Sequence, residues 1–338
     1  MRGFTLVETV ISLAVTLMVM AMTLPILKAS RQGFISAEIQ NSLKESDQSI
    51  QSHISRNLVQ CKRIFENVAN DSAFVGRIGP VAPLALAGSL MPTKVENGIL
   101  SPKSDADRLQ VGNSLLFARF DVPIDMMATA TTSITAPQGY NESIRLDAYR
   151  FDYYYLNLMG NGLKLGDKEA LNLWEWESIP YVDYGEILAI QNFTKSTSTV
   201  AILYSMGYRT AWLPSSKLVD DAFYNLYSSG TTSHAASSLI TPLRIQPDRN
   251  SSLLKILTGI TSQYSYGVSP NSGNQASRNP VPAFAKSNGD FPGGFEVQVV
   301  GNAMARQVYM RLVLMARGAD GIIRSNEAVC LTSTKDVW

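Results

Sequence analysis

The chain has 338 residues, of which 45% are hydrophobic and 17% are charged, and its formal net charge is +1. A chain of this length can bury a large core, and its composition excludes collagen and bulk disorder. The near-zero charge and the lack of a basic block give no indication of a nucleic-acid partner. Two histidines and two cysteines are too few for a zinc finger or most multi-histidine metal sites.

The segment from Phe4 to Leu27 is apolar apart from one charge, Glu8. About 20 apolar residues are enough to cross a bilayer as a helix, so residues 4–27 are expected to form a transmembrane segment. The run is too long for the core of a signal peptide, and no Ala-x-Ala cleavage box follows it. A plain membrane anchor remains an alternative if Glu8 reaches the headgroups, because a carboxylate at the membrane centre costs roughly 2.5–3.5 kcal/mol.

The residues around the start of this segment suggest a more specific interpretation. Arg2 and Gly3 precede Phe4-Thr-Leu-Val-Glu8, and the apolar run follows directly. This order resembles the leader of type IV prepilins. The resemblance implies that residues 1–3 are a leader, that a prepilin peptidase cuts between Gly3 and Phe4, and that Phe4 is then N-methylated. It also implies that Glu8 pairs with the N-terminal amine of a neighbouring subunit, since a buried carboxylate is tolerated beside a positive partner. Pro25 lies where the family often has a helix-kinking proline.

The helix is expected to continue beyond the membrane segment through residues 28–65. Apolar residues recur there at intervals of three or four, at Ile35, Ile39, Ile50, Ile54, Leu58 and Cys61. This spacing puts them on one face of a helix, with polar residues on the other faces. The whole helix would be roughly 90 Å long, and its second half would pack an apolar stripe against a globular head. A free-standing coiled coil is the alternative, although the stripe lacks sustained heptads.

Residues 66–338 are predicted to form a β-rich head. Strands are expected at residues 108–122 (two strands divided at Gly112), 144–158, through Trp174 and Trp176, and at 186–193, 199–208, 295–300, 305–316 and 321–331. Residues 253–265 are a further mixed apolar segment. A short helix is expected at residues 220–227. One long helix followed by many strands predicts an α+β fold, in which the helix packs on an antiparallel sheet with large insertions.

The head also resembles the same family, more loosely. Segments 104–111, 256–267, 306–317 and 322–325 look like strands of PilW-type minor pilins and of the larger minor pseudopilins. This likeness and the size of the chain imply a low-abundance subunit, whereas residues 125–250 have no family counterpart. The implied partners are prepilin peptidase, other major and minor pilins, and an inner-membrane assembly platform. The implied location is the inner membrane with the head in the periplasm, or a pilus at the cell surface after assembly.

The two cysteines, Cys61 and Cys330, allow two interpretations. Outside the cytoplasm a disulfide is permitted, and it would tie the end of the helix to the C-terminal edge of the head. Closing a loop of about 270 residues would contribute roughly 5 kcal/mol at most in the chain-entropy model. The alternative is a pair of free thiols, with Cys61 on the apolar stripe of the helix.

The sequence offers few other chemical sites. Asp105 and Asp107 are a candidate Ca²⁺ site, since some secretion pseudopilins bind Ca²⁺, and a solvated turn is the alternative. No other metal or cofactor is expected, because His53 and His234 have no cysteine or carboxylate nearby at ligand spacing. The chain also lacks a Gly-x-Ser-x-Gly elbow and a P-loop.

These observations favour a structural subunit of a type IV pilus, in its initiation or tip complex, and not an enzyme. Three alternatives stay open. They are a minor pseudopilin of a type II secretion system, a membrane-anchored periplasmic enzyme, and a filament-tip adhesin. The adhesin would hold a surface or a sugar with the unmatched middle region, residues 125–250. Tyr153, Tyr155, Trp174 and Trp176 are candidates for a sugar-binding or adhesive face, although core packing explains these residues more simply.

Overall fold

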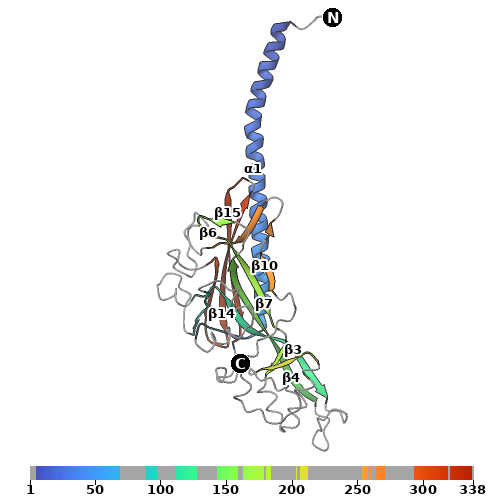
Figure 1. Ribbon diagram of the computed structural model, residues 1–338, viewed down its shortest axis with the longest axis vertical. Helices are drawn as coiled ribbons and strands as arrows, with labels where there is room; N and C mark the ends of the chain where they lie inside the picture. The colour runs from blue at the N-terminus through green and yellow to red at the C-terminus, as the bar shows by residue number, and fades with distance from the viewer. Residues whose placement is uncertain are drawn as a thin grey trace, which may run out of the picture.

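The computed structural model describes residues 5–68, 89–96, 111–127, 143–158, 163–178, 180–183, 203, 206–211, 253–257, 259–260, 264–270, 293–318 and 320–336. Within these residues the chain begins with one long helix, α1 (Leu6–Val59), and continues almost entirely as strands. Figure 1 shows that α1 projects far beyond a β-rich head, which packs along its second half. The expected layout of one long helix on a β-sheet head is therefore confirmed.

The strands follow α1 in a fixed order along the chain. They are β1 (Cys61–Ile64), β2 (Lys94–Val95), β3 (Leu115–Met127), β4 (Ser143–Leu158), β5 (Lys164–Leu165), β6 (Lys168–Glu169), β7 (Leu171–Glu177), β8 (Tyr181–Asp183), β9 (Arg209–Ala211), β10 (Leu253–Leu257), β11 (Gly259–Ile260), β12 (Tyr264–Val268), β13 (Phe295–Val300), β14 (Arg306–Gly318) and β15 (Ile323–Thr334).

Within the described residues, thirteen of these strands form one sheet, whose main path runs β1-β3-β4-β7-β12-β14-β13-β2. β15 pairs with β14 without interruption, from Arg306 opposite Thr334 to Arg317 opposite Ile323. The sheet was expected to be antiparallel, but it is mixed, because β2 pairs with β13 and β8 pairs with β9 in parallel. Both exceptions involve short strands that join the sheet after long connections, which parallel pairing requires.

One face of the sheet carries the second half of α1. The side chains that α1 buries there include Ile39, Leu43, Ile50, Ile54 and Leu58. They pack against inward-facing residues of β3, β4, β7, β13 and β14 in a single hydrophobic core. The predicted apolar stripe is therefore confirmed from Ile39 to Leu58, with Leu43 as an additional member, whereas Ile35 is only partly buried and Cys61 lies beyond the helix.

Strand β15 lies beside α1 and runs in the same direction. Near the start of the strand, Arg324 Nε donates a hydrogen bond of 2.8 Å to Ser36 Oγ. At the end of the strand, Thr334 Oγ1 donates a bond of 2.6 Å to the Leu58 carbonyl. Both elements therefore lead from the exposed half of α1 towards the far end of the head.

The end of α1 differs from the prediction. The helix ends at Val59 and not near residue 65, because Cys61–Ile64 form β1 and pair with β3. Gln60 caps the helix, and its carbonyl accepts a hydrogen bond from the Phe120 amide at 2.9 Å. Pairing with a distant strand thus overrides the local helical pattern. Cys61 is consequently a strand residue.

The strand predictions have mixed outcomes. The structure confirms the strands at 144–158, through Trp174 and Trp176, and near the C-terminus, and it divides residues 253–265 among three short strands. Of the two strands expected within 108–122, the second is β3, which starts at Leu115, whereas residues 108–110 of the first lie outside the described residues. Gly112 makes an isolated bridge to Val297. A Cβ at Gly112 would lie 2.4 Å from Pro92 N, so only glycine fits there. The elements expected at 186–193 and 220–227 and most of 199–208 lie outside the described residues.

Candidate functional site on the long helix

The first half of α1 is exposed and apolar on all sides. None of the surface of its most apolar window is buried, and the helix is long and apolar enough to cross a membrane. The stretch from Leu6 to Leu27 rises about 33 Å at 1.5 Å per residue, which is close to the roughly 30 Å of a hydrocarbon core. A helix that is hydrophobic on every side needs lipid or other helices around it.

A capping box closes the N-terminal end of α1. Glu8 Oε2 accepts hydrogen bonds from Thr5 N and Thr5 Oγ1, both at 2.9 Å, and Thr5 Oγ1 accepts from Glu8 N at 3.4 Å. The carboxylate therefore lies in the first turn, where the positive end of the helix dipole favours it. Gly3 and Phe4, the residues of the expected cleavage site, lie outside the described residues.

Pro25 lies within α1, which passes through it as one continuous helix (Figure 1). Proline has no N–H, so the hydrogen bond that position 25 would donate to the Ala21 carbonyl is missing. Such a missing bond locally weakens a helix at the depth where the span meets its polar continuation.

The helix is joined to the sheet by a polar cluster that the sequence did not reveal. Glu175 Oε1 on β7 accepts hydrogen bonds from His53 Nε2 at 2.8 Å, Asn57 Nδ2 at 3.3 Å and the Tyr154 hydroxyl at 2.5 Å. The bond to Glu175 is the main cause that raises the pKa of His53. Burial opposes ionisation of Glu175, but the bonds from His53 and Tyr154 outweigh it and lower the pKa of Glu175. His53 thus has a carboxylate partner 122 residues away in sequence, which no local spacing could indicate.

A buried carboxylate, Asp47, interrupts the apolar stripe of α1. Its side chain is fully buried against β15, where the Asn326 side-chain amide donates a hydrogen bond to Asp47 Oδ2. Asp47 Oδ1 has no hydrogen-bond partner among the described residues. Burial, with a smaller contribution from Glu327, raises the pKa of Asp47 to about 7.

Two further ion-pair networks join strands of the sheet. Arg119 Nε on β3 donates to Asp152 Oδ2 on β4 at 2.5 Å. Arg311 on β14 pairs with Glu296 on β13 at 3.0 Å and with Glu327 on β15 at 2.8 Å. Each network bridges neighbouring strands. Within the part of the chain that the structure describes, no group of three or more His, Cys, Asp or Glu residues is arranged to hold a metal ion. The candidate Ca²⁺ ligands Asp105 and Asp107, like His234, lie outside that part.

Of the two interpretations of the cysteines, the structure agrees with the free thiols, because Cys61 and Cys330 form no disulfide. Cys330 Sγ lies 3.2 Å from Ser55 Oγ on α1, whereas Cys61 is next to Thr334 at the end of β15. Residues 330 and 334 are about 13 Å apart along a strand, which is too far for a bond that needs Cα atoms within about 7 Å. Burial raises the pKa of the Cys61 thiol, so this cysteine is an inert core residue.

The aromatic residues of β4 and β7 belong mainly to the core. Tyr153, Tyr155 and Trp176 are each at most 2% exposed, and the two tyrosine rings stack with centroids 5.1 Å apart. Trp174 is partly exposed. These residues therefore do not form an exposed aromatic face, and the core-packing interpretation holds for them.

The comparisons with known proteins give no further guide. No protein-family model, curated protein or solved structure matches the chain. The function is therefore inferred from the N-terminal motif and from the geometry of α1.

Proposed function

We propose that the chain is a structural minor pilin subunit. A prepilin peptidase cuts it between Gly3 and Phe4, the first half of α1 holds it in the inner membrane, and the subunit is then added to a type IV pilus. The observation that carries the proposal is the division of α1 into an exposed apolar half and a half fixed to a β-rich head. The exposed apolar half can then lie in lipid before assembly and among other helices after it.

The packing of the head supports this exchange of environments. The second half of α1 is fixed by its apolar stripe and by the Glu175 cluster. The first half of α1 is exposed over the described residues 5–34, so none of its surface is buried against the described part of the head when it moves from lipid into a bundle of helices. Association of such helices depends on close packing, since lipid is as apolar as the helix surface.

The position of Glu8 is consistent with a role in assembly. Among the described residues its hydrogen bonds are confined to Thr5, in its own first turn. A carboxylate beside apolar surroundings is costly unless a positive group is near. The free amine created by cleavage before Phe4 in a neighbouring subunit would supply that positive group.

The size of the head favours an initiation or tip complex. The described sheet has thirteen strands and extends well beyond the diameter of α1 (Figure 1). A head this large is difficult to repeat along a tightly packed shaft, so the subunit is expected at low copy number.

Mass spectrometry of the N-terminal peptide from membranes tests the processing step. We expect the wild-type peptide to begin at N-methylated Phe4. Gly3→Val should leave the Met1 start intact, because a bulky residue replaces the glycine that the leader motif requires. Gly33→Ala is the matched control, since a Cβ at Gly33 meets no atom within 4 Å, and it should be processed normally. A wild-type chain that starts at Met1, or that is cut beyond Pro25, would refute the proposal and favour the membrane-anchored enzyme.

A further inference from the structure

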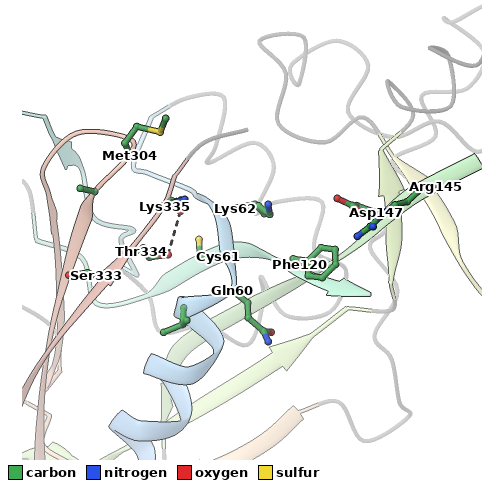
Figure 2. Close-up of a pocket in the computed structure, with 12 residues that line it drawn as sticks. Gln60, Cys61, Lys62, Phe120, Arg145, Asp147, Met304, Ser333, Thr334 and Lys335 are labelled. Atoms are coloured by element: carbon green, nitrogen blue, oxygen red, sulfur yellow. Dashed lines mark hydrogen bonds and ion pairs between the residues drawn. The ribbon is translucent and has the colours of Figure 1, made fainter. Parts of the chain in front are cut away.

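A groove of about 880 Å³ lies where the end of α1 meets the sheet. Figure 2 shows its lining, which comes from α1, β1, β3, β4, the β13–β14 turn and the end of β15. The volume is within the range of roughly 300–1,000 Å³ that ligand sites occupy. The groove is thus large enough for several side chains of a partner.

The groove has an unusually exposed apolar lining. Val59 is 68% exposed and Met304 is 67% exposed, and they line the groove together with a partly exposed aromatic ring, Phe120. Single exposed apolar residues are ordinary, but apolar residues gathered around a hollow mark a binding surface. Methionine also adapts its shape to different partners. This lining favours a protein segment over a small ion.

The charge of the groove is positive. Lys62 and Lys335 line it, and neither makes an ion pair with any described residue. Lys62 Nζ lies 5.9 Å from the centre of the Phe120 ring, which places this cation against the apolar lining. The third cation, Arg145, has its acidic neighbour Asp147 3.9 Å away.

The end of α1 does not neutralise this charge. The last carbonyls of a helix carry partial negative charge, which would repel an acidic ligand if they were open to the groove. Here the Leu58 carbonyl accepts from Thr334 Oγ1 and the Gln60 carbonyl accepts from the Phe120 amide. These carbonyls are satisfied within the protein, so the lysines set the character of the groove.

The location of the groove excludes a lipid surface as its ligand. α1 and β15 both lead away from the membrane-spanning half, and the groove lies where they end. From Leu27 to Val59 the helix rises about 48 Å. A straight helix would therefore hold the groove far from the headgroups at which Leu27 emerges.

We propose that this groove binds an acidic segment of a partner protein, in which carboxylates alternate with apolar side chains. The carboxylates meet Lys62 and Lys335, and the apolar side chains cover Val59, Phe120 and Met304. This inference goes beyond the proposed pilin function. Its choice of a protein over a lipid ligand rests on the membrane-spanning half of α1, whereas binding itself requires only the folded head.

Fluorescence anisotropy with the detergent-solubilised full-length chain tests the proposal. The probe is a labelled synthetic peptide that alternates aspartate with leucine. We expect saturable binding that weakens with salt, and a loss of affinity of about tenfold or more when Lys62→Glu and Lys335→Glu are combined. Lys44→Glu is the matched control, because Lys44 is an exposed cation on α1 outside the groove, and it should leave the affinity unchanged.

Two control peptides decide between the remaining outcomes. The same peptide with lysine for aspartate should not bind, and the same peptide with serine for leucine should bind more weakly. Equal binding of the serine peptide would overturn the proposal, because the groove would then recognise charge alone, as an anion or acidic-sugar site does. Binding that survives in the double lysine variant would place the site elsewhere. A neutral pair, Lys62→Gln with Lys335→Gln, should give an intermediate loss and guards against misfolding of the charge-reversed protein.

Discussion

At the scale of single residues, Asp47 is a buried carboxylate with no cation among its described partners. It is fully buried, its partner is an uncharged amide, and Glu327 lies nearby. Its pKa is raised from 3.8 to about 7. The folded state therefore binds the Asp47 proton more tightly than the unfolded chain does, and stability falls as the pH rises from about 4 to about 7.

This leads to a prediction for Asp47→Asn, which removes the ionisation and keeps the shape of the side chain. From about pH 5 to pH 8, the free energy of unfolding should fall more for the wild type than for the variant, as measured by chemical unfolding. About two pH units separate pH 5 from the folded-state pKa, so at 1.36 kcal/mol per unit the difference over this window is at most about 3 kcal/mol. His53 also has a raised pKa and contributes a pH dependence of the same sign, so the comparison between variants isolates Asp47.

Glu45→Gln is the control for this prediction, because Glu45 is an exposed carboxylate on the same helix. The free energy of unfolding of Glu45→Gln should change between pH 5 and pH 8 as it does in the wild type. Parallel loss of stability in the wild type and Asp47→Asn would show that Asp47 titrates normally.

The same residue shows why sequence alone missed part of the interface. Asp47 lies four positions after Leu43 and three before Ile50, which is the spacing of the buried face, although polar residues were expected only on the other faces. A charged residue on such a face gives no sign of its partner, and Asn326 lies 279 residues later. His53 and Glu175 present the same difficulty, since only the fold brings them together.

At the scale of elements, the packing of α1 on the sheet should depend on a few side chains. Ile54 is 1% exposed in the core between helix and sheet. Ile54→Ala should lower the free energy of unfolding by about 2–5 kcal/mol, from lost burial and the cavity left behind. Chemical unfolding in detergent, followed by tryptophan fluorescence, measures this change.

The matched control is Val59→Ala on the same helix, because Val59 is exposed. It should change stability by no more than about 0.5 kcal/mol. Equal losses in the two variants would mean that α1 is not held by its apolar stripe.

The ends of elements were harder to predict than their faces. The stripe of α1 follows directly from the spacing of isoleucines and leucines, and the structure confirms it. The helix end does not follow, because Cys61-Lys-Arg-Ile64 contains no glycine or proline and is compatible with either helix or strand. Pairing with β3 makes these residues a strand, and the same pairing separates Cys61 from Cys330.

At the scale of the whole molecule, the layout followed from the order of patterns along the chain. An apolar run, an amphipathic continuation and alternating segments gave a projecting helix on a β-rich head, as Figure 1 shows. The groove could not be foreseen, because its lining comes from residues between Val59 and Lys335 that have no shared motif. Its character depends on which lysines are left without an acidic partner, and this is a property of the fold.

The central claim is that the processed chain becomes part of a filament, and one measurement tests it most directly. Quantitative mass spectrometry would compare the peptide that begins at methylated Phe4 in sheared surface filaments and in membranes. The account predicts this peptide in the filaments, at far lower abundance than the main subunit. Abundance equal to the main subunit would contradict a minor role in a tip or initiation complex. Confinement of the processed peptide to membranes would contradict incorporation into a surface pilus and favour a secretion pseudopilus.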